Sequence, residues 1–174
     1  MTVIPTLNEA AHVAAVVEGF LAAPAAGPVW VVDGGSRDAT CAIVKGLAAG
    51  NPRVRLVHNP DRPQGAALNL AARLAARAGH DALIRAAAHA RYPDGYATGL
   101  LEALRRTGAQ SVPVPLLAAV DQPGPWVRAA IALQRHWLGH GGARHRQAGG
   151  AGWTDHGHHA AFQLDWFLGL GGYD

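Results

Sequence analysis

Short apolar segments alternate with amphipathic segments through the first half of the chain. The apolar segments cover residues 2–5, 29–34, 53–59 and 81–86. After the first of them, Val13, Val17 and Phe20 recur at helical spacing. Similar patterns predict helices over residues 64–78 and 93–106. Because strands that alternate with helices form parallel sheets covered on both faces, we expect an α/β fold with a Rossmann-like, mostly parallel sheet.

Two local signals refine this expectation. Asn8 precedes the first periodic segment and has a side chain that suits a helix N-cap, which predicts that the first helix begins there. The segment SVPVPLL, residues 111–117, contains two prolines, which cannot donate to a sheet ladder. We expect this segment to be an edge strand or irregular.

Composition limits the classes of protein that remain. The chain has 174 residues, of which 49% are hydrophobic and 16% charged, so it can bury a core as one domain, or as part of one. No apolar run approaches the roughly 18–20 residues that cross a bilayer. The net charge of +3 is compatible with an anionic nucleotide but too small and dispersed for nucleic-acid binding. A single cysteine, Cys41, and no visible signal peptide predict a cytoplasmic protein.

Ligands of parallel α/β sheets bind at the carboxyl ends of the strands. Asp33 ends an apolar strand there and is followed by Gly34, Gly35 and Ser36. Its carboxylate could accept a hydrogen bond from a base N–H or a ribose hydroxyl, and the glycines allow a ligand to approach the backbone closely. The alternative is an Asp that stabilises a tight turn before a helix. The segment has neither dinucleotide-fingerprint nor P-loop spacing.

Several stretches, taken together, resemble a known family. VIPTLNEAAHV, VVDGGSRDAT, NPDRPQGAALNLA and RAAAHARYP resemble successive motifs of the family 2 glycosyltransferases. GGARHRQAGG and HHAAFQLDWFLGLGGYD resemble the subgroup related to succinoglycan-biosynthesis enzymes. The resemblance implies a GT-A fold and an inverting transfer of sugar from a nucleotide-diphosphate sugar to a hydroxyl acceptor. It further implies a role in polysaccharide or cell-surface glycan synthesis.

The resemblance also implies a set of donor-binding residues. Asp33 matches the acid that recognises the base, and an asparagine on the helix of residues 64–78 matches a family asparagine. Arg62 and Gly65 match a loop that closes over the nucleotide. A solvated charge at Arg62 and an exposed polar residue at Asn69 are the alternatives. The implied donor-binding residues are Pro5, Asn8, Glu9, Asp33, Arg62, Gly65 and Asn69.

A divalent cation and a general base are the other requirements that the resemblance implies. Mg²⁺ or Mn²⁺ would stabilise the diphosphate leaving group, and carboxylate oxygens are its preferred ligands. The family places an Asp-x-Asp or Asp-x-His motif after the fourth strand, but Ala87 stands at the first position and only His89 remains as a candidate ligand. The base lies beyond the segment that ends at Asp174, so we expect a truncated chain.

The remaining part of the chain is rich in histidine. The resemblance implies a nucleotide-sugar half at 1–106 and an acceptor-side part at 107–174 of one incomplete domain, with His158 and His159 on the acceptor side. The acceptor would be a glycan or a lipid-linked glycan, and peripheral association with the inner face of the membrane follows by resemblance. Two alternatives stay open: an inactive nucleotide-sugar-binding remnant, favoured by Ala87, and a metal-binding domain built on the histidines.

Overall fold

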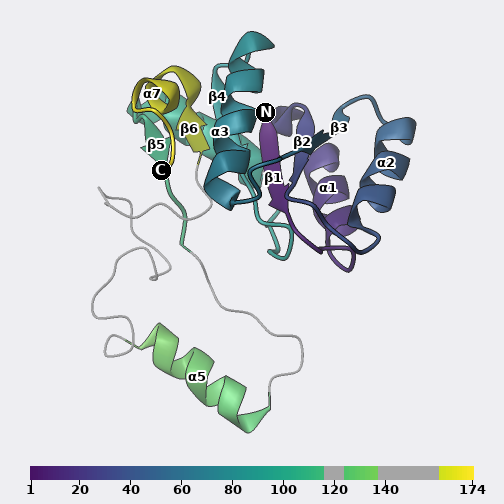
Figure 1. Cartoon of the computed structure of the whole chain (residues 1–174). Coiled ribbons are helices and arrows are strands. Elements are labelled where there is room, and N and C mark those ends of the chain that lie inside the picture. The colour runs from purple at the N-terminus through teal and green to yellow at the C-terminus, as the bar shows by residue number, and fades with distance from the viewer. Residues whose placement is uncertain (116–123, 137–160) are drawn as a thin grey trace. The chain divides into compact units, whose positions relative to one another are not determined.

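A computed structural model describes residues 1–115, 124–136 and 161–174 of the chain (Figure 1). The chain divides into two compact units. The first comprises Met1–Val112 and Ala160–Asp174, and the second comprises Pro113–His159. The expected division into a nucleotide-sugar half and an acceptor-side part concerns function and stays a prediction. His158 and His159 lie outside the described residues.

The first unit is built on one sheet, which has six strands in the described part of the chain, in the order β3-β2-β1-β4-β6-β5. Strands β1, β2, β3 and β4 run parallel, whereas β6 is antiparallel to both β4 and β5. The mostly parallel sheet that the alternating pattern predicted is therefore confirmed. The strands are β1 (Thr2–Thr6), β2 (Val29–Asp33), β3 (Val54–His58), β4 (Ala82–Arg85), β5 (Ser111–Val112) and β6 (Ala161–Gln163).

Helices cover both faces of this sheet, as expected. On one face α3 (Gln64–Arg77) and α7 (Leu164–Gly169) pack on side chains such as Val32 and Leu83. The other face carries α1 (Val13–Ala22), α2 (Thr40–Gly50) and α4 (Tyr96–Thr107), and a short 3-10 helix (Pro24–Ala26) follows α1. Every residue of β1 and β2 is buried, which explains their uninterrupted apolar sequences.

One local expectation was wrong and another was confirmed. Helix α1 begins at Val13, not at Asn8, and Asn8 adopts a left-handed backbone with φ of 57°. The Asn8 side chain accepts a hydrogen bond from the backbone N–H of Arg37, so it joins two loops where we expected a helix cap. Within the described residues 111–115, the segment forms the edge strand β5 at Ser111–Val112, as expected, and pairs no further, because Pro113 and Pro115 lack the N–H that would continue the ladder.

The second unit contains α5 (Pro125–Arg135), which starts with proline in its first turn. None of the helices described combines the length and apolar character needed to cross a membrane.

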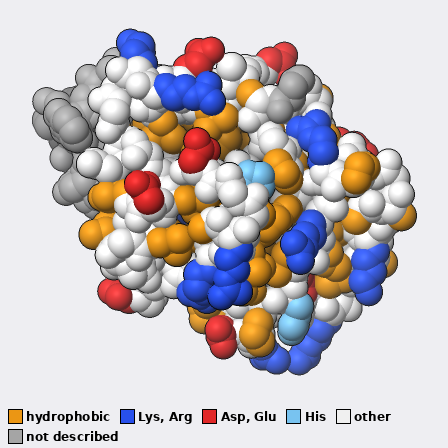
Figure 2. All heavy atoms as spheres, turned by 90° about the horizontal axis from the view of Figure 1, so that it is seen from above, with side chains coloured by type: hydrophobic (Ala, Val, Ile, Leu, Met, Phe, Trp, Pro, Cys, Tyr) orange, Lys and Arg blue, Asp and Glu red, His pale blue; other side chains and the backbone are white. Residues whose placement is uncertain are grey.

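Figure 2 shows that, on the face seen there, Lys and Arg side chains are separated by hydrophobic, uncharged and acidic ones. That dispersed charge agrees with the small net charge of +3.

Candidate functional site

A cavity of about 330 Å³ opens at the carboxyl edge of the sheet. It lies where the strand order changes direction, since the chain passes from β1 outward to β2 and β3 and returns to β4 on the other side of β1. Ligands of open α/β sheets bind in this crevice. The lining residues are Pro5, Thr6, Leu7, Glu9, Val32, Arg62, Pro63, Gln64, Ala67, Ala87, Ala88 and His89.

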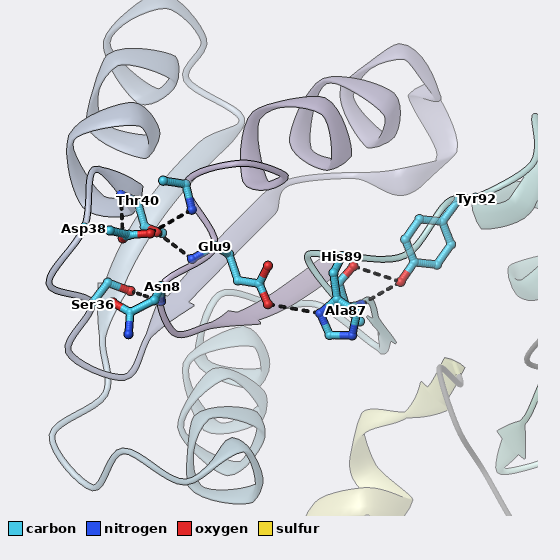
Figure 3. A network of polar contacts seen from close by, with 9 residues as sticks. Asn8, Glu9, Ser36, Asp38, Thr40, Ala87, His89 and Tyr92 are labelled. Atoms are coloured by element: carbon cyan, nitrogen blue, oxygen red, sulfur yellow. Dashed lines mark hydrogen bonds and ion pairs between the residues drawn. The ribbon is translucent and has the colours of Figure 1, made fainter. Parts of the chain in front are cut away.

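Hydrogen bonds tie the loop after β1 to the loop after β2 (Figure 3). The backbone N–H of Asn8 donates to Ser36 Oγ over 2.8 Å, and the N–H of Glu9 donates to Thr40 Oγ1 over 2.8 Å. Asp38 accepts from the N–H of Ala10 over 3.0 Å. The hydroxyl and N–H of Thr40 also donate to Asp38 and lower the pKa of its carboxyl. These contacts hold Glu9 at the edge of the cavity.

Asp33 is buried at the end of β2, with 4% of its surface exposed. Its Oδ2 accepts from the N–H groups of Gly35 and Ser36 over 2.8 and 3.0 Å, and its Oδ1 accepts from the Ser36 hydroxyl. Burial alone would raise the pKa of Asp33, but these hydrogen bonds, with one from Cys41, lower it below its ordinary value. The carboxylate is thus ionised at neutral pH and engaged in the turn. Oδ2 accepts from two backbone N–H groups and Oδ1 from the Ser36 hydroxyl, so Oδ1 has more accepting capacity left than Oδ2.

The end of β4 meets Glu9 through His89 (Figure 3). Glu9 Oε1 lies 3.0 Å from His89 Nδ1, and the imidazole side chain is 68% exposed against 20% for the carboxylate. The hydroxyl of Tyr92 accepts from the N–H of Ala87 over 2.6 Å and donates to the Ala87 carbonyl over 3.3 Å. Tyr92 is packed between Phe20 and Tyr96, with ring centroids 4.9 and 4.8 Å away. The backbone of residue 87 is therefore firmly positioned.

The donor set at this edge does not fit a divalent cation held by protein side chains alone. Glu9 and His89 supply one carboxylate and one imidazole, and they are bound to each other. Ala87 has no ligating atom, and within the residues described no three His, Cys, Asp or Glu side chains lie close enough to share a metal. Mg²⁺ takes octahedral oxygen ligands, of which one carboxylate is a small part. His89 as a ligand stays a prediction.

Asn69 on α3 binds the backbone of the C-terminal segment. Its Nδ2 donates to the Tyr173 carbonyl over 2.7 Å, and its Oδ1 accepts from the Tyr173 N–H over 2.9 Å. Gly65 lies against the same segment, where a Cβ would come 3.1 Å from Tyr173 Cβ. Neither residue lines the cavity. Both were expected from the resemblance to contact the donor, and their described contacts are instead with Tyr173.

Arg62 lines the cavity from a loop that folds over the end of β2. Its φ of 66° is unusual for a residue with a side chain. Its carbonyl oxygen would lie 2.9 Å from a Cβ at Gly34, so the loop can approach this closely only because residue 34 is glycine. Strained backbones of this kind cluster at ligand sites. Arg62 therefore lines the cavity, and its contact with a nucleotide stays a prediction.

Sequence reasoning missed several residues of this cavity. Thr6 ends β1, is 6% exposed, and its hydroxyl has no hydrogen-bond partner in the structure. Asn59, after β3, does not line the cavity, but it is 1% exposed and its Oδ1 is also unpaired. Gln64 begins α3 and lines the cavity. All three residues lie within the stretches that resemble family motifs, but nothing in their residue types alone indicated a contact with a ligand. Of the expected donor-binding residues, the cavity brings together Pro5, Glu9 and Arg62, and it also includes His89.

The sheet topology and the position of the cavity define a Rossmann-like α/β protein with a ligand crevice at the carboxyl edge of its sheet. The sequence model of the family described as "Glycosyl transferase family 2" matches residues 2–169, and the chain belongs to this family. The fold is accordingly of the GT-A type. The succinoglycan biosynthesis protein ExoA of Rhizobium meliloti (strain 1021) is 41% identical over 177 residues, which cover 100% of this chain and 52% of that protein. The chain therefore spans about half the length of this curated relative.

Solved structures support the same fold. The mannosyltransferase of Pyrobaculum calidifontis in complex with GDP-Man and Mn²⁺ matches with a TM-score of 0.62 and 24% identity, over 99% of this chain and 46% of that chain. Glucosyl-3-phosphoglycerate synthase of Mycobacterium tuberculosis, in complex with Mn²⁺, UDP and glucosyl-3-phosphoglycerate, matches with a TM-score of 0.55 and 20% identity. That match covers 94% of this chain and 56% of the synthase. At these identities the likeness concerns the fold.

Proposed function

We propose that this chain forms the donor-binding region of an inverting glycosyltransferase that uses a nucleotide-diphosphate sugar. The single observation that carries the proposal is the cavity between the ends of β1 and β4, which is lined by Glu9, Arg62 and Val32, the residue before Asp33. Membership of the family supplies the reaction class, transfer of a sugar to a hydroxyl. The name of the relative from R. meliloti supports polysaccharide synthesis as the process.

The residues around the cavity have distinct tasks in this proposal. Asp33 Oδ1 accepts a hydrogen bond from an N–H of the base or a hydroxyl of the ribose, while Oδ2 keeps the turn in place. Gly34 leaves room for the Arg62 loop, and Arg62 brings a positive charge toward the phosphates. The loop contacts of Asn8 fix the crevice wall before the ligand arrives, which lowers the ordering cost of binding.

Transfer also requires departure of the diphosphate and an acceptor that receives the sugar. The complexes of the mannosyltransferase and the synthase contain Mn²⁺, but the described residues of this chain provide no matching set of ligands, so we assign no step to a cation. We propose a glycan or lipid-linked glycan as acceptor, bound on the side of His158 and His159. We further propose that the protein acts in the cytoplasm at the inner face of the membrane, because a lipid-linked acceptor would be presented there.

A second candidate function is nucleotide-sugar binding without turnover. It is favoured by Ala87, whose methyl group occupies the position where the family resemblance implies a metal-binding acid, and by the mutual engagement of Glu9 and His89. In this case the crevice would bind the donor through Asp33 and Arg62 but would lack the groups that promote departure of the diphosphate. The two candidates share the binding step and differ only in transfer.

The test is calorimetric titration of the chain with UDP and with GDP. We expect one of them to bind, and Asp33→Asn to weaken that binding about tenfold or more, because a charge-assisted hydrogen bond contributes roughly 1.5–3 kcal/mol. Asp94→Asn is the matched control, since it makes the same change at an exposed carboxyl to which the proposal gives no role in binding. A thermal melt of each variant separates loss of binding from loss of folding. Absence of binding by either nucleotide would overturn both candidates, and sugar transfer or donor hydrolysis would decide between them.

A further inference from the structure

The first turn of α3 faces the cavity without a capping side chain. The residue before the helix is Pro63, and no side chain bonds to the first N–H groups of α3. Pro63, Gln64 and Ala67 all line the cavity. Because the N–H groups of a helix N-terminus carry partial positive charge and have no intrahelical acceptor, this end of α3 favours an anion. The helix runs from Gln64 to Arg77, so its aligned peptide dipoles are substantial.

Arg62 adds a full positive charge beside this helix end. Its side chain is exposed and lines the cavity, and in the part of the chain that the structure describes its guanidinium has no acidic partner. Glu9 is the carboxylate on the same wall, and its Oε1 is engaged by His89 Nδ1 at 3.0 Å. The left-handed backbone of Arg62, with φ of 66°, holds the residue in a conformation that a glycine would adopt more easily. Strained backbone conformations cluster at functional sites, and the positive charge of Arg62 at the cavity favours an anionic ligand.

Gln64 is oriented by a chain of contacts that begins at the C-terminal segment. Arg85 Nη2 donates to Gln64 Oε1 over 2.9 Å, and Arg85 Nη1 donates to the Tyr173 hydroxyl over 3.2 Å. The Arg85 guanidinium also lies 5.7 Å from the centre of the Tyr173 ring. Asn69 fixes the Tyr173 backbone with two hydrogen bonds. Since Gln64 Oε1 is occupied by Arg85, the free end of the amide is its NH₂ group, which donates hydrogen bonds.

Thr6 provides an independent sign that this cavity receives a polar ligand. It lines the cavity from the end of β1, only 6% of its surface is exposed, and its hydroxyl has no partner. A buried hydroxyl without a hydrogen bond costs free energy that a ligand oxygen would recover. The donors at the helix end, Arg62 and Thr6 therefore border one cavity from two different elements.

We propose that the N-terminus of α3, Arg62 and Gln64 bind the diphosphate of the nucleotide sugar directly, without a divalent cation. This inference rests on the proposed function and concerns the same cavity. Binding without a cation would also distinguish this chain from the mannosyltransferase and the synthase described above, whose complexes contain Mn²⁺. Here residue 87 is alanine and the described residues hold no three-ligand cluster, whereas positive charge and N–H donors are available. Arg85, Tyr173 and Asn69 are positioning residues in this arrangement.

The test is calorimetric titration of the full chain with UDP, with GDP and with inorganic pyrophosphate, each in EDTA and in Mn²⁺. We expect the preferred nucleotide and pyrophosphate to bind equally in the two buffers, within about twofold. Arg62→Gln should weaken both about tenfold, because one charge-assisted contact is lost. Arg77→Gln, at the opposite end of α3, is the matched control and should leave the affinities for the nucleotide and for pyrophosphate unchanged. Arg62→Gly should lose binding to the same extent while its melting temperature stays equal or rises.

Tyr173→Phe tests the positioning chain. It keeps the ring and removes only the hydroxyl that accepts from Arg85, so we expect about threefold weaker pyrophosphate binding with little change in melting temperature. Nucleotide binding that requires Mn²⁺, or that survives Arg62→Gln, would overturn the inference and leave the proposed function standing. Pyrophosphate binding without UDP or GDP binding would overturn the proposed function and leave the anion site. Failure of all three ligands would overturn both.

Discussion

Glu9 and His89 meet at the cavity, with Glu9 Oε1 3.0 Å from His89 Nδ1, although 80 positions separate them in the sequence. Parallel strands bring them together, because β1 and β4 are neighbours and the loops that follow them emerge at the same edge. Neither residue is held by a third ligating side chain among those described. The pair alone is too small a ligand set for a divalent cation, and residue 87 is the neighbouring position at which a further carboxylate can be introduced.

Ala87→Asp should create a binding site for Mn²⁺ together with a nucleotide. The new carboxylate would stand two residues before His89, on a backbone that Tyr92 fixes through two hydrogen bonds. We expect Mn²⁺ affinity in the presence of UDP or GDP to rise about tenfold or more, measured by the loss of the free Mn²⁺ signal in electron paramagnetic resonance. The asparagine of Ala87→Asn has nearly the volume of aspartate but no charge, so this variant should leave the Mn²⁺ affinity close to that of the parent chain. Equal gains in both variants would contradict a role for the carboxylate.

Much of the sheet could be predicted from the sequence, because β1 and β2 are buried on both faces and their apolar runs are unambiguous. Asn8 was misread because a polar residue before a helix can equally bond to a distant loop, and the partner Arg37 lies 29 positions away. The contacts of Asn69 and Arg85 with Tyr173 could not be predicted either. They depend on how the C-terminal segment returns to α3, which no local pattern encodes.

Gly172 and Gly171 form a matched pair for testing how the C-terminal segment is docked. Both have positive φ, 83° and 87°, so alanine strains the backbone at either position. A Cβ at Gly172 would overlap Asn69 Oδ1, whereas a Cβ at Gly171 would meet nothing within 4 Å. We expect Gly171→Ala to cost about 1 kcal/mol of unfolding free energy. Gly172→Ala should cost about 1–3 kcal/mol more, because it also displaces Asn69 from two hydrogen bonds. Urea unfolding measures both, and equal losses would rule out the Asn69 contact as a source of stability.

Asn69→Ala should reproduce the additional loss of unfolding free energy that we expect for Gly172→Ala relative to Gly171→Ala. It removes the donor to the Tyr173 carbonyl and the acceptor from the Tyr173 N–H, so we expect a loss of about 1–3 kcal/mol in urea unfolding. In the double variant with Gly172→Ala the two losses should be less than additive, since both break the same contacts. Strict additivity would show that Gly172 and Asn69 stabilise the chain independently.

Tyr92 should titrate well above an ordinary tyrosine. Burial raises its pKa to about 12, against smaller lowering effects from the Ala87 hydrogen bond and Arg85. Burial raises the pKa of Tyr96 as well. Because the folded chain disfavours the phenolate, the stability linked to Tyr92 is complete below pH 10 and is lost as the pH rises toward 12. Ultraviolet absorbance of the folded chain should show delayed ionisation, and Tyr92→Phe should remove one of the late steps. A single transition near pH 10 for all tyrosines would contradict the buried environment of Tyr92.

Asp33 should make the folded chain sensitive to acid. Its pKa is lowered in the folded state, since the hydrogen bonds from Ser36 and Gly35 outweigh burial. A depressed pKa means that the stability from Asp33 is present above the pKa of the unfolded carboxyl, near 3.9, and is lost as the pH falls through the folded value. We expect urea midpoints measured between pH 7 and pH 3 to fall less steeply for Asp33→Asn than for the parent chain. Asp94→Asn, which alters an exposed carboxyl, should follow the parent curve. If Asp33→Asn also follows it, the carboxylate of Asp33 is not stabilised by its turn.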